Sequence, residues 1–164
     1  MPSPLDRVLA NYRRAAEKRL TGRADVPLPV LAAESRAVSP AAAIILLDTL
    51  GRTLGVPPGK LRANDSLELL FAVRPEEPAE VPPEARDAAG STDGEDALSA
   101  TLLAELRRVT VRSAWERMSR TITPPPRGDR QWLNVMLGLR VDEWVRTWAP
   151  AVSPGLVRDA GGVP

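Results

Sequence analysis

Residues 40–54 read PAAAIILLDTLGRTL, a strongly apolar stretch that the segment GVPP follows directly at 55–58. Ser39 and Pro40 favour a helix start there, because serine can accept a hydrogen bond from an orphan N–H and proline suits the first helical position. Gly55 is a typical helix end, and the two prolines after it prevent the helix from continuing. We therefore expect a helix over 40–54 that is buried on more than one side.

Apolar residues recur at helical spacing in several other segments on both sides of this helix. The predicted helices cover residues 5–20, 66–73, 96–109, 115–122, 129–137 and 141–149. Three β-branched residues between 109 and 111 predict a break near Thr110, and Asp129 is a candidate cap for the helix that follows it. The fold class we expect is all-α: an irregular bundle of five to seven short helices.

The charges divide the chain into blocks, although the net charge is only +1. Residues 74–94 contain four prolines and six acidic residues but almost no large apolar side chain. Such a stretch buries too little surface to offset its ordering entropy. We expect a helical region over 1–73, a flexible acidic linker over 74–94, a helical region with all four tryptophans over 95–150, and a disordered tail over 151–164. One alternative is that the two helical regions form separate subdomains.

Cysteine and histidine are both absent. Their absence removes disulfides, thiol nucleophiles, the usual zinc sites and all imidazole catalysis. The adjacent carboxylates Glu76 and Glu77 lie in the predicted linker, where nothing would desolvate them for acid–base work. We therefore expect a protein that is not an enzyme and that binds no metal. The first residues also show no signal-peptide pattern and no run long enough to span a bilayer, which predicts a cytoplasmic protein with no membrane partner.

Trp144 and Trp148 are one helical turn apart, near the predicted frayed end of the chain. Core packing is one interpretation of this pair. The other is a partly exposed patch that binds a partner, because tryptophan is enriched at binding hot spots. We take the pair as the candidate partner-binding residues.

Residues 40–70 resemble the first helix and following loop of acyl carrier proteins. In that family an apolar helix ends in Leu-Gly-Val, and a serine followed by phenylalanine or leucine comes about ten residues later; Leu54-Gly55-Val56 and Ser66-Leu67 match this spacing. The resemblance implies a carrier-like helical scaffold. Asp65-Ser66-Leu67 is also the tripeptide that carries phosphopantetheine in such proteins, but its spacing aligns Ser66 with the earlier loop pair, so we expect no attached cofactor.

The leading functional hypothesis is a non-enzymatic, carrier-like helical adaptor that binds another protein. One alternative is an acyl or peptidyl carrier modified with 4'-phosphopantetheine at Ser66. A second is a small DNA-binding regulator, which rests on helix–turn–helix patterning around Leu137, Gly138 and Leu139 and on the arginines of residues 97–164. Under the leading hypothesis the partner is a protein, and nucleic acid is not expected to bind.

Overall fold

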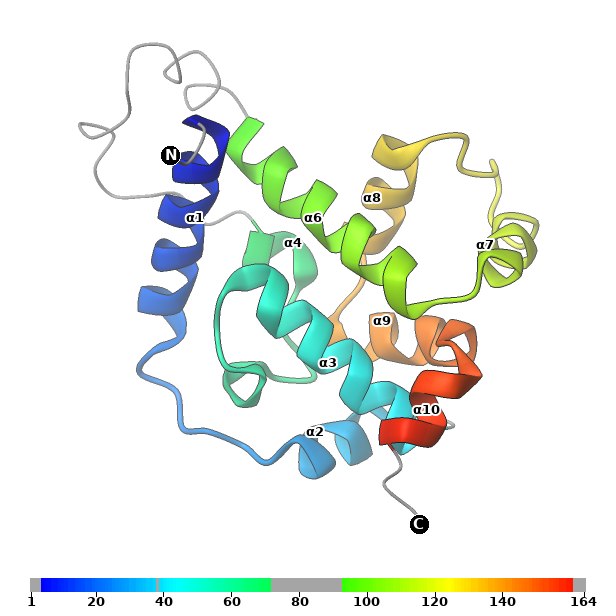
Figure 1. Ribbon diagram of the computed structural model, residues 1–164, viewed down its shortest axis with the longest axis horizontal. Coiled ribbons are helices and arrows are strands. Elements are labelled where there is room, and N and C mark those ends of the chain that lie inside the picture. The colour runs from blue at the N-terminus through cyan, green and yellow to red at the C-terminus, as the bar shows by residue number, and fades with distance from the viewer. Residues whose placement is uncertain (1–3, 38, 72–92, 161–164) are drawn as a thin grey trace.

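The computed structural model describes residues 4–37, 39–71 and 93–160, and these residues form an all-α bundle (Figure 1). This confirms the predicted fold class, with more and shorter helices than the sequence pattern indicated. The α-helices of the described residues are α1 (Pro4–Leu20), α2 (Leu28–Ser35), α3 (Pro40–Leu54), α4 (Leu67–Phe71), α6 (Asp93–Val109), α7 (Arg112–Ser119), α8 (Asp129–Leu137), α9 (Val141–Trp148) and α10 (Pro154–Ala160). Two short 3-10 turns, η1 (Pro58–Lys60) and η3 (Ala149–Ala151), join them.

Helix α3 lies at the centre of the bundle and contacts α1, α2, α6, α9 and α10 (Figure 1). Its ends form as the sequence predicts: the Ala42 N–H donates to Ser39 Oγ at 3.2 Å, and Gly55 ends the helix with a φ of 73°. Most of its side chains are buried, and they lie on several faces of the helix. The prediction of a helix buried on more than one side is confirmed.

The two predicted helical regions share one hydrophobic core and do not separate into subdomains. Helix α6, from the second region, packs against α1 and α3 of the first. Fully buried leucines from both regions belong to the same cluster, among them Leu46, Leu50, Leu102 and Leu106. Most of the predicted linker lies outside the described residues, and its last two positions, Asp93 and Gly94, already belong to α6.

The chain breaks after α6, as the β-branched residues predict. Thr110 pairs with Val152 in an isolated antiparallel bridge. The Val111 N–H donates to the Ala151 carbonyl and the Ser153 N–H donates to the Val109 carbonyl, both at 2.8 Å. This pairing corrects the predicted disordered tail over 151–164: residues 151–152 are buried, 154–160 form α10, and 161–164 lie outside the described residues.

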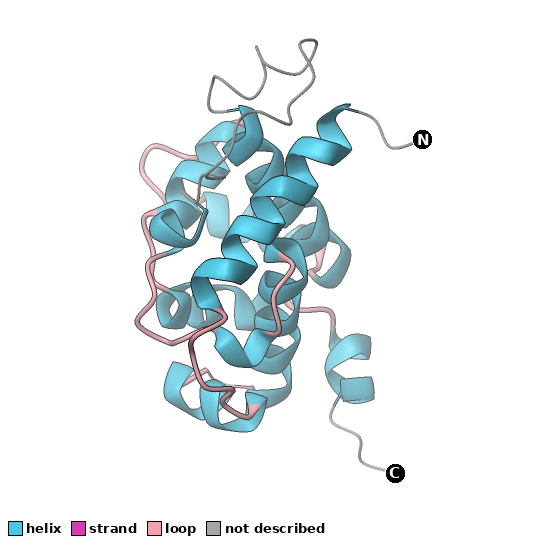
Figure 2. Ribbon diagram, turned by 90° about the vertical axis from the view of Figure 1, so that its left-hand side faces the viewer, coloured by secondary structure: helices cyan, strands magenta, loops and turns pink. Residues whose placement is uncertain are grey.

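Helix α10 follows this pairing and packs against α3 (Figure 1), and in Figure 2 it is the helix nearest the C mark. It starts at Pro154, a residue that is pre-organised for the first turn of a helix. Pro154 and Gly155 therefore belong to a helix within the segment that was predicted to be disordered. The bonds between 109–111 and 151–153 hold the chain before this helix against the bundle.

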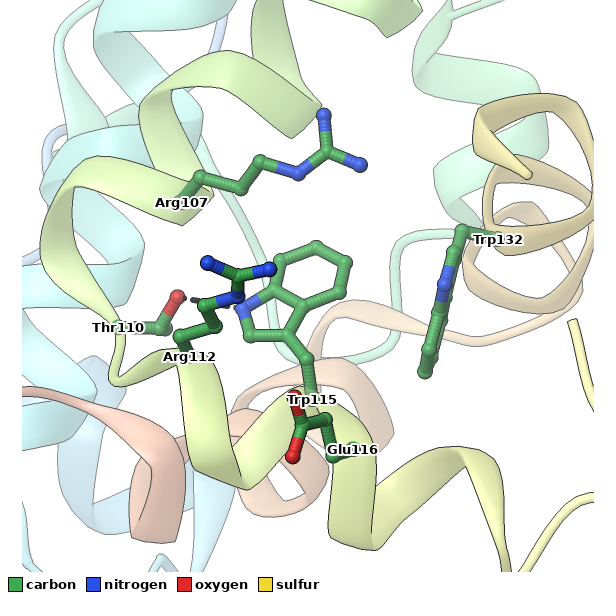
Figure 3. Close-up of a pocket in the computed structure, with 6 residues that line it drawn as sticks. All are labelled: Arg107, Thr110, Arg112, Trp115, Glu116 and Trp132. Carbon is green, nitrogen blue, oxygen red and sulfur yellow. Dashed lines mark hydrogen bonds between the residues drawn. The ribbon is translucent and has the colours of Figure 1, made fainter. Parts of the chain in front are cut away.

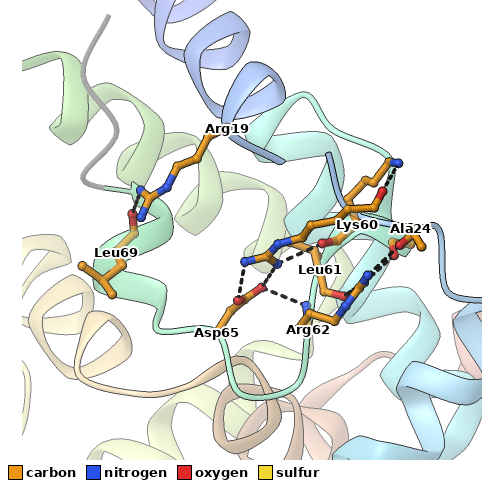
Figure 4. A network of polar contacts seen from close by, with 9 residues as sticks. Arg19, Ala24, Lys60, Leu61, Arg62, Asp65 and Leu69 are labelled. Atoms are coloured by element: carbon orange, nitrogen blue, oxygen red, sulfur yellow. Dashed lines mark hydrogen bonds and ion pairs between the residues drawn. The ribbon is translucent and has the colours of Figure 1, made fainter. Parts of the chain in front are cut away.

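A polar network ties the loop after α1 to the loop before α4 (Figure 4). The Arg23 guanidinium donates two hydrogen bonds to the Asp65 carboxylate, at 2.7 and 2.9 Å, and these bonds raise the pKa of Arg23. Asp65 also accepts from the Arg62 N–H at 2.8 Å, while the Arg62 side chain donates to the Ala24 carbonyl at 2.6 Å. The network fixes the position of Ser66, which follows Asp65.

Candidate functional site

The end of α6, the start of α7 and helix α8 enclose a groove of about 500 Å³ (Figure 3). Its lining combines two indoles, two guanidinium groups, a carboxylate and a hydroxyl, which belong to Trp115, Trp132, Arg107, Arg112, Glu116 and Thr110. The break at Thr110 creates this arrangement, because α7 starts in a new direction and brings Trp115 back beside the last turn of α6.

Two indole rings, those of Trp115 and Trp132, line the groove, and a third, that of Trp148, packs against both of them. The ring centroids of Trp115 and Trp132 lie 5.0 Å apart in an edge-to-face arrangement, and Trp148 lies 4.5 Å from Trp115 and 5.8 Å from Trp132. These separations are in the range at which aromatic pairs attract one another beyond simple burial. Trp115 is 9% exposed and Trp132 is 8% exposed, and both residues line the groove.

Hydrogen bonds hold the Trp115 ring in place. Its Nε1–H donates to Thr110 Oγ at 2.8 Å, and the Thr110 hydroxyl donates in turn to the Leu106 carbonyl at 2.5 Å. The indole N–H is thus satisfied inside the protein, since buried polar groups are costly when unpaired. What Trp115 offers to the groove is apolar ring surface (Figure 3).

Arg107 lies above this ring, with its guanidinium carbon 5.2 Å from the Trp115 ring centroid. The same guanidinium donates to both carboxylate oxygens of Asp129, one of them at 3.4 Å. These bonds hold the pKa of Asp129 below its usual range. The sequence predicted Asp129 as the cap of its helix; instead Gly128 is the N-cap, Asp129 is the first residue of α8, and its carboxylate pairs with Arg107.

Arg112 and Glu116 form the open side of the groove. Both side chains are exposed, and neither has an ion-pair partner within 4–37, 39–71 or 93–160. They are four residues apart on α7 and so lie on the same helix face. The groove therefore presents one arginine that is not engaged by the protein and one that Asp129 already occupies.

The predicted exposure of Trp144 and Trp148 is wrong, because the two side chains are 0% and 1% exposed. Residues 151–152, at the start of the predicted disordered tail, are instead folded back and buried. The Trp144 Nε1–H donates to Met136 Sδ at 3.4 Å, inside the core. The pair therefore presents no surface to a partner, and the edges of Trp115 and Trp132 take its place as candidate binding residues. Trp115 and Trp132 are visible in the sequence, but they lie on different helices, and no sequence pattern indicates that these helices bring them together.

Ser66 is half-buried at the start of α4. Its hydroxyl accepts a hydrogen bond from the Leu69 N–H at 3.4 Å, and its backbone pairs with Arg140 in an isolated bridge. Neighbouring bonds run from the Leu67 N–H to the Leu139 carbonyl and from the Val141 N–H to the Asp65 carbonyl, at 3.1 and 2.9 Å. Ser66 thus lies in a loop that is bonded on both sides to the turn before α9, and the groove does not include it.

The predicted helix–turn–helix corresponds to α8, the short turn after it and α9. The apolar side chains of α9, Val141, Trp144, Val145 and Trp148, are buried, which leaves a polar side that includes two carboxylates. Arg140 pairs with Asp142 and Glu143 at 3.4 and 3.3 Å, and Arg146 lies 3.8 Å from Asp142. Because both arginines are paired, this side of α9 has no excess positive charge for phosphate contacts.

Within the part of the chain that the structure describes, no three acidic side chains gather as a metal site would need. No helix of that part is by itself long and apolar enough to cross a membrane; α2 and α3 together reach the required length and apolarity only across a 110° bend. Comparison of the chain with protein-family models, curated proteins and solved structures gives no match.

Proposed function

We propose that this protein is a non-enzymatic helical adaptor that binds another protein through the groove between α6, α7 and α8. The observation that supports this most is the meeting of two tryptophan edges and two arginines in one open depression. Tryptophan and arginine are enriched among the residues that dominate binding energy at protein interfaces.

The shape and rigidity of the groove favour a protein partner. Small molecules bind in cavities that cover most of their surface, whereas this groove is open along Arg112 and Glu116. Its aromatic floor is held by the bond from Trp115 to Thr110 and by packing on Trp148. A pre-ordered surface loses little side-chain freedom when a partner binds, and that favours affinity.

The lining offers little for catalysis. The Thr110 hydroxyl already donates to the Leu106 carbonyl and accepts from the Trp115 indole, so it is not positioned as a nucleophile beside a base. The one carboxylate in the lining, Glu116, is exposed to water. These features support binding as the role of the groove.

Site-specific photo-crosslinking in the native host tests this proposal. A photoreactive residue at position 112 should yield a discrete covalent adduct with one protein. The matched control is position 117, which is also an exposed arginine of α7 but lies about 140° around the helix from 112 and outside the groove. Identical adducts from the two positions, or none from position 112, would overturn the proposal.

A further inference from the structure

We propose that the partner segment presents a carboxylate next to an apolar side chain, and that this carboxylate replaces Asp129 on Arg107. This inference rests on the proposed function and specifies the chemistry of the partner. The apolar side chain would lie on the edges of Trp115 and Trp132, and the carboxylate would face Arg107 and Arg112.

The structure already holds a carboxylate against Arg107. Asp129 contacts both terminal nitrogens of that guanidinium, at the border of a groove whose floor is apolar. Arginine binds carboxylates through two parallel N–H donors, so a carboxylate from another chain can make the same pair of bonds. Asp129 in this way occupies the place of the partner's acidic group.

Replacing the Asp129 carboxylate with a partner's carboxylate costs little free energy. The Arg107 and Asp129 side chains are 48% and 63% exposed, and ion pairs at that exposure contribute little to stability. Asp129 is also the first residue of α8, where the positive end of the helix stabilises a negative charge after Arg107 has left it. Arg107 itself can keep its contact with the Trp115 ring while it binds the new carboxylate.

The unpaired arginine of the lining favours an acidic group over a basic one. Arg107 and Arg112 are the two cations of the lining, and Glu116 is its one carboxylate. Arg107 is bonded to Asp129, whereas Arg112 has no ion-pair partner among the described residues. A guanidinium that no carboxylate of its own chain holds can bind a carboxylate of a partner.

The apolar part of the groove sets the second requirement. A volume of about 500 Å³ leaves room for one large apolar side chain and an adjoining acidic group. The two indole edges offer that side chain aromatic contacts, which are worth more than area burial alone. A purely acidic segment would leave these edges uncovered.

Fluorescence anisotropy with three labelled, blocked peptides tests the inference on the full chain. The sequences are EEFLEE, KKFLKK and EEGGEE, which change the charge and the apolar centre separately. We expect EEFLEE to bind more tightly than either of the others. Arg107→Gln should weaken its binding by about two- to fivefold, the effect of losing an exposed ion pair, while Arg117→Gln should leave it unchanged. Both arginines are exposed or half-exposed, and unchanged circular dichroism would verify that the variants fold.

Asp129→Asn distinguishes the exchange from simple attraction between charges. Removal of the competing carboxylate should tighten EEFLEE binding by about two- to fivefold, the range that corresponds to an exposed ion pair. Equal or weaker binding by the variant overturns the exchange, and equal binding of KKFLKK, or no binding of EEFLEE, overturns the acidic partner. A specific adduct in the crosslinking experiment alongside any of these results would leave the adaptor function standing.

Discussion

Trp148→Ala should destabilise the protein severely, because Trp148 joins the aromatic cluster to the core. The side chain is almost fully buried, and its ring centroid lies 4.5 Å from that of Trp115 and 5.8 Å from that of Trp132. Truncation of a buried tryptophan costs about 3–5 kcal/mol. The loss of two aromatic contacts, each worth about 0.5–1.5 kcal/mol, places this site in the upper part of that range.

Urea unfolding and thermal melts, both followed by far-ultraviolet circular dichroism, measure this cost. In a chain of this size, 1 kcal/mol corresponds to about 2–4 °C, so a loss of about 4 kcal/mol lowers the melting temperature by about 8–16 °C. Trp148→Phe keeps part of the ring contact, so it should lower the free energy of unfolding by about 1–2 kcal/mol. This variant can still be measured if Trp148→Ala does not fold. The control is Leu69→Ala, since Leu69 is exposed and should change stability by less than about 0.5 kcal/mol. A loss below about 1 kcal/mol in Trp148→Ala would refute the cluster as a core element.

The remaining predictions concern the loops that hold α3 and α4. Gly59→Ala should cost about 1–3 kcal/mol in urea unfolding, because its Cβ would lie 2.8 Å from the Val26 carbonyl oxygen; Gly22→Ala, with open space around it, should cost much less, and equal losses would contradict the argument. Asp65→Ala removes the carboxylate that accepts two hydrogen bonds from a partly buried arginine, and should lower the free energy of unfolding by about 1–3 kcal/mol. Ser66 should gain no mass on incubation with a phosphopantetheinyl transferase and coenzyme A; a gain of one prosthetic group that is absent in Ser66→Ala would favour the carrier alternative.

Local signals predicted much of the fold correctly. Ser39 and Gly55 cap α3 because the hydrogen bond and the positive φ that they provide depend on the residues themselves. The break at Thr110 follows from the β-branched residues around it. Each feature depends on only a few neighbouring residues, so it can be predicted from the sequence.

Contacts between distant segments were not predictable in the same way. Aspartate is a residue type that often caps helices, but the Asp65 carboxylate accepts from Arg23, more than forty positions earlier in the chain, and the Ser66 hydroxyl accepts from the first turn of α4. Trp148 was expected near a frayed end, yet the pairing of Thr110 with Val152 folds that end onto the core. The groove arises from three helices that meet only in the folded chain, so no sequence pattern indicates it. The carrier-like relationship of residues 40–70 and the cytoplasmic location stay predictions.

The central claim, that the groove between α6, α7 and α8 binds an acidic segment with an apolar centre, is tested most directly by titration with EEFLEE followed through the tryptophan indole N–H signals. These signals distinguish the four rings in a two-dimensional ¹H–¹⁵N nuclear magnetic resonance spectrum. We predict saturable shifts for Trp115 and Trp132, which line the groove, and no shift for Trp144, which is fully buried against Met136. Unchanged Trp115 and Trp132 signals, with shifts confined to backbone amides of α1 or α2, would contradict the claim.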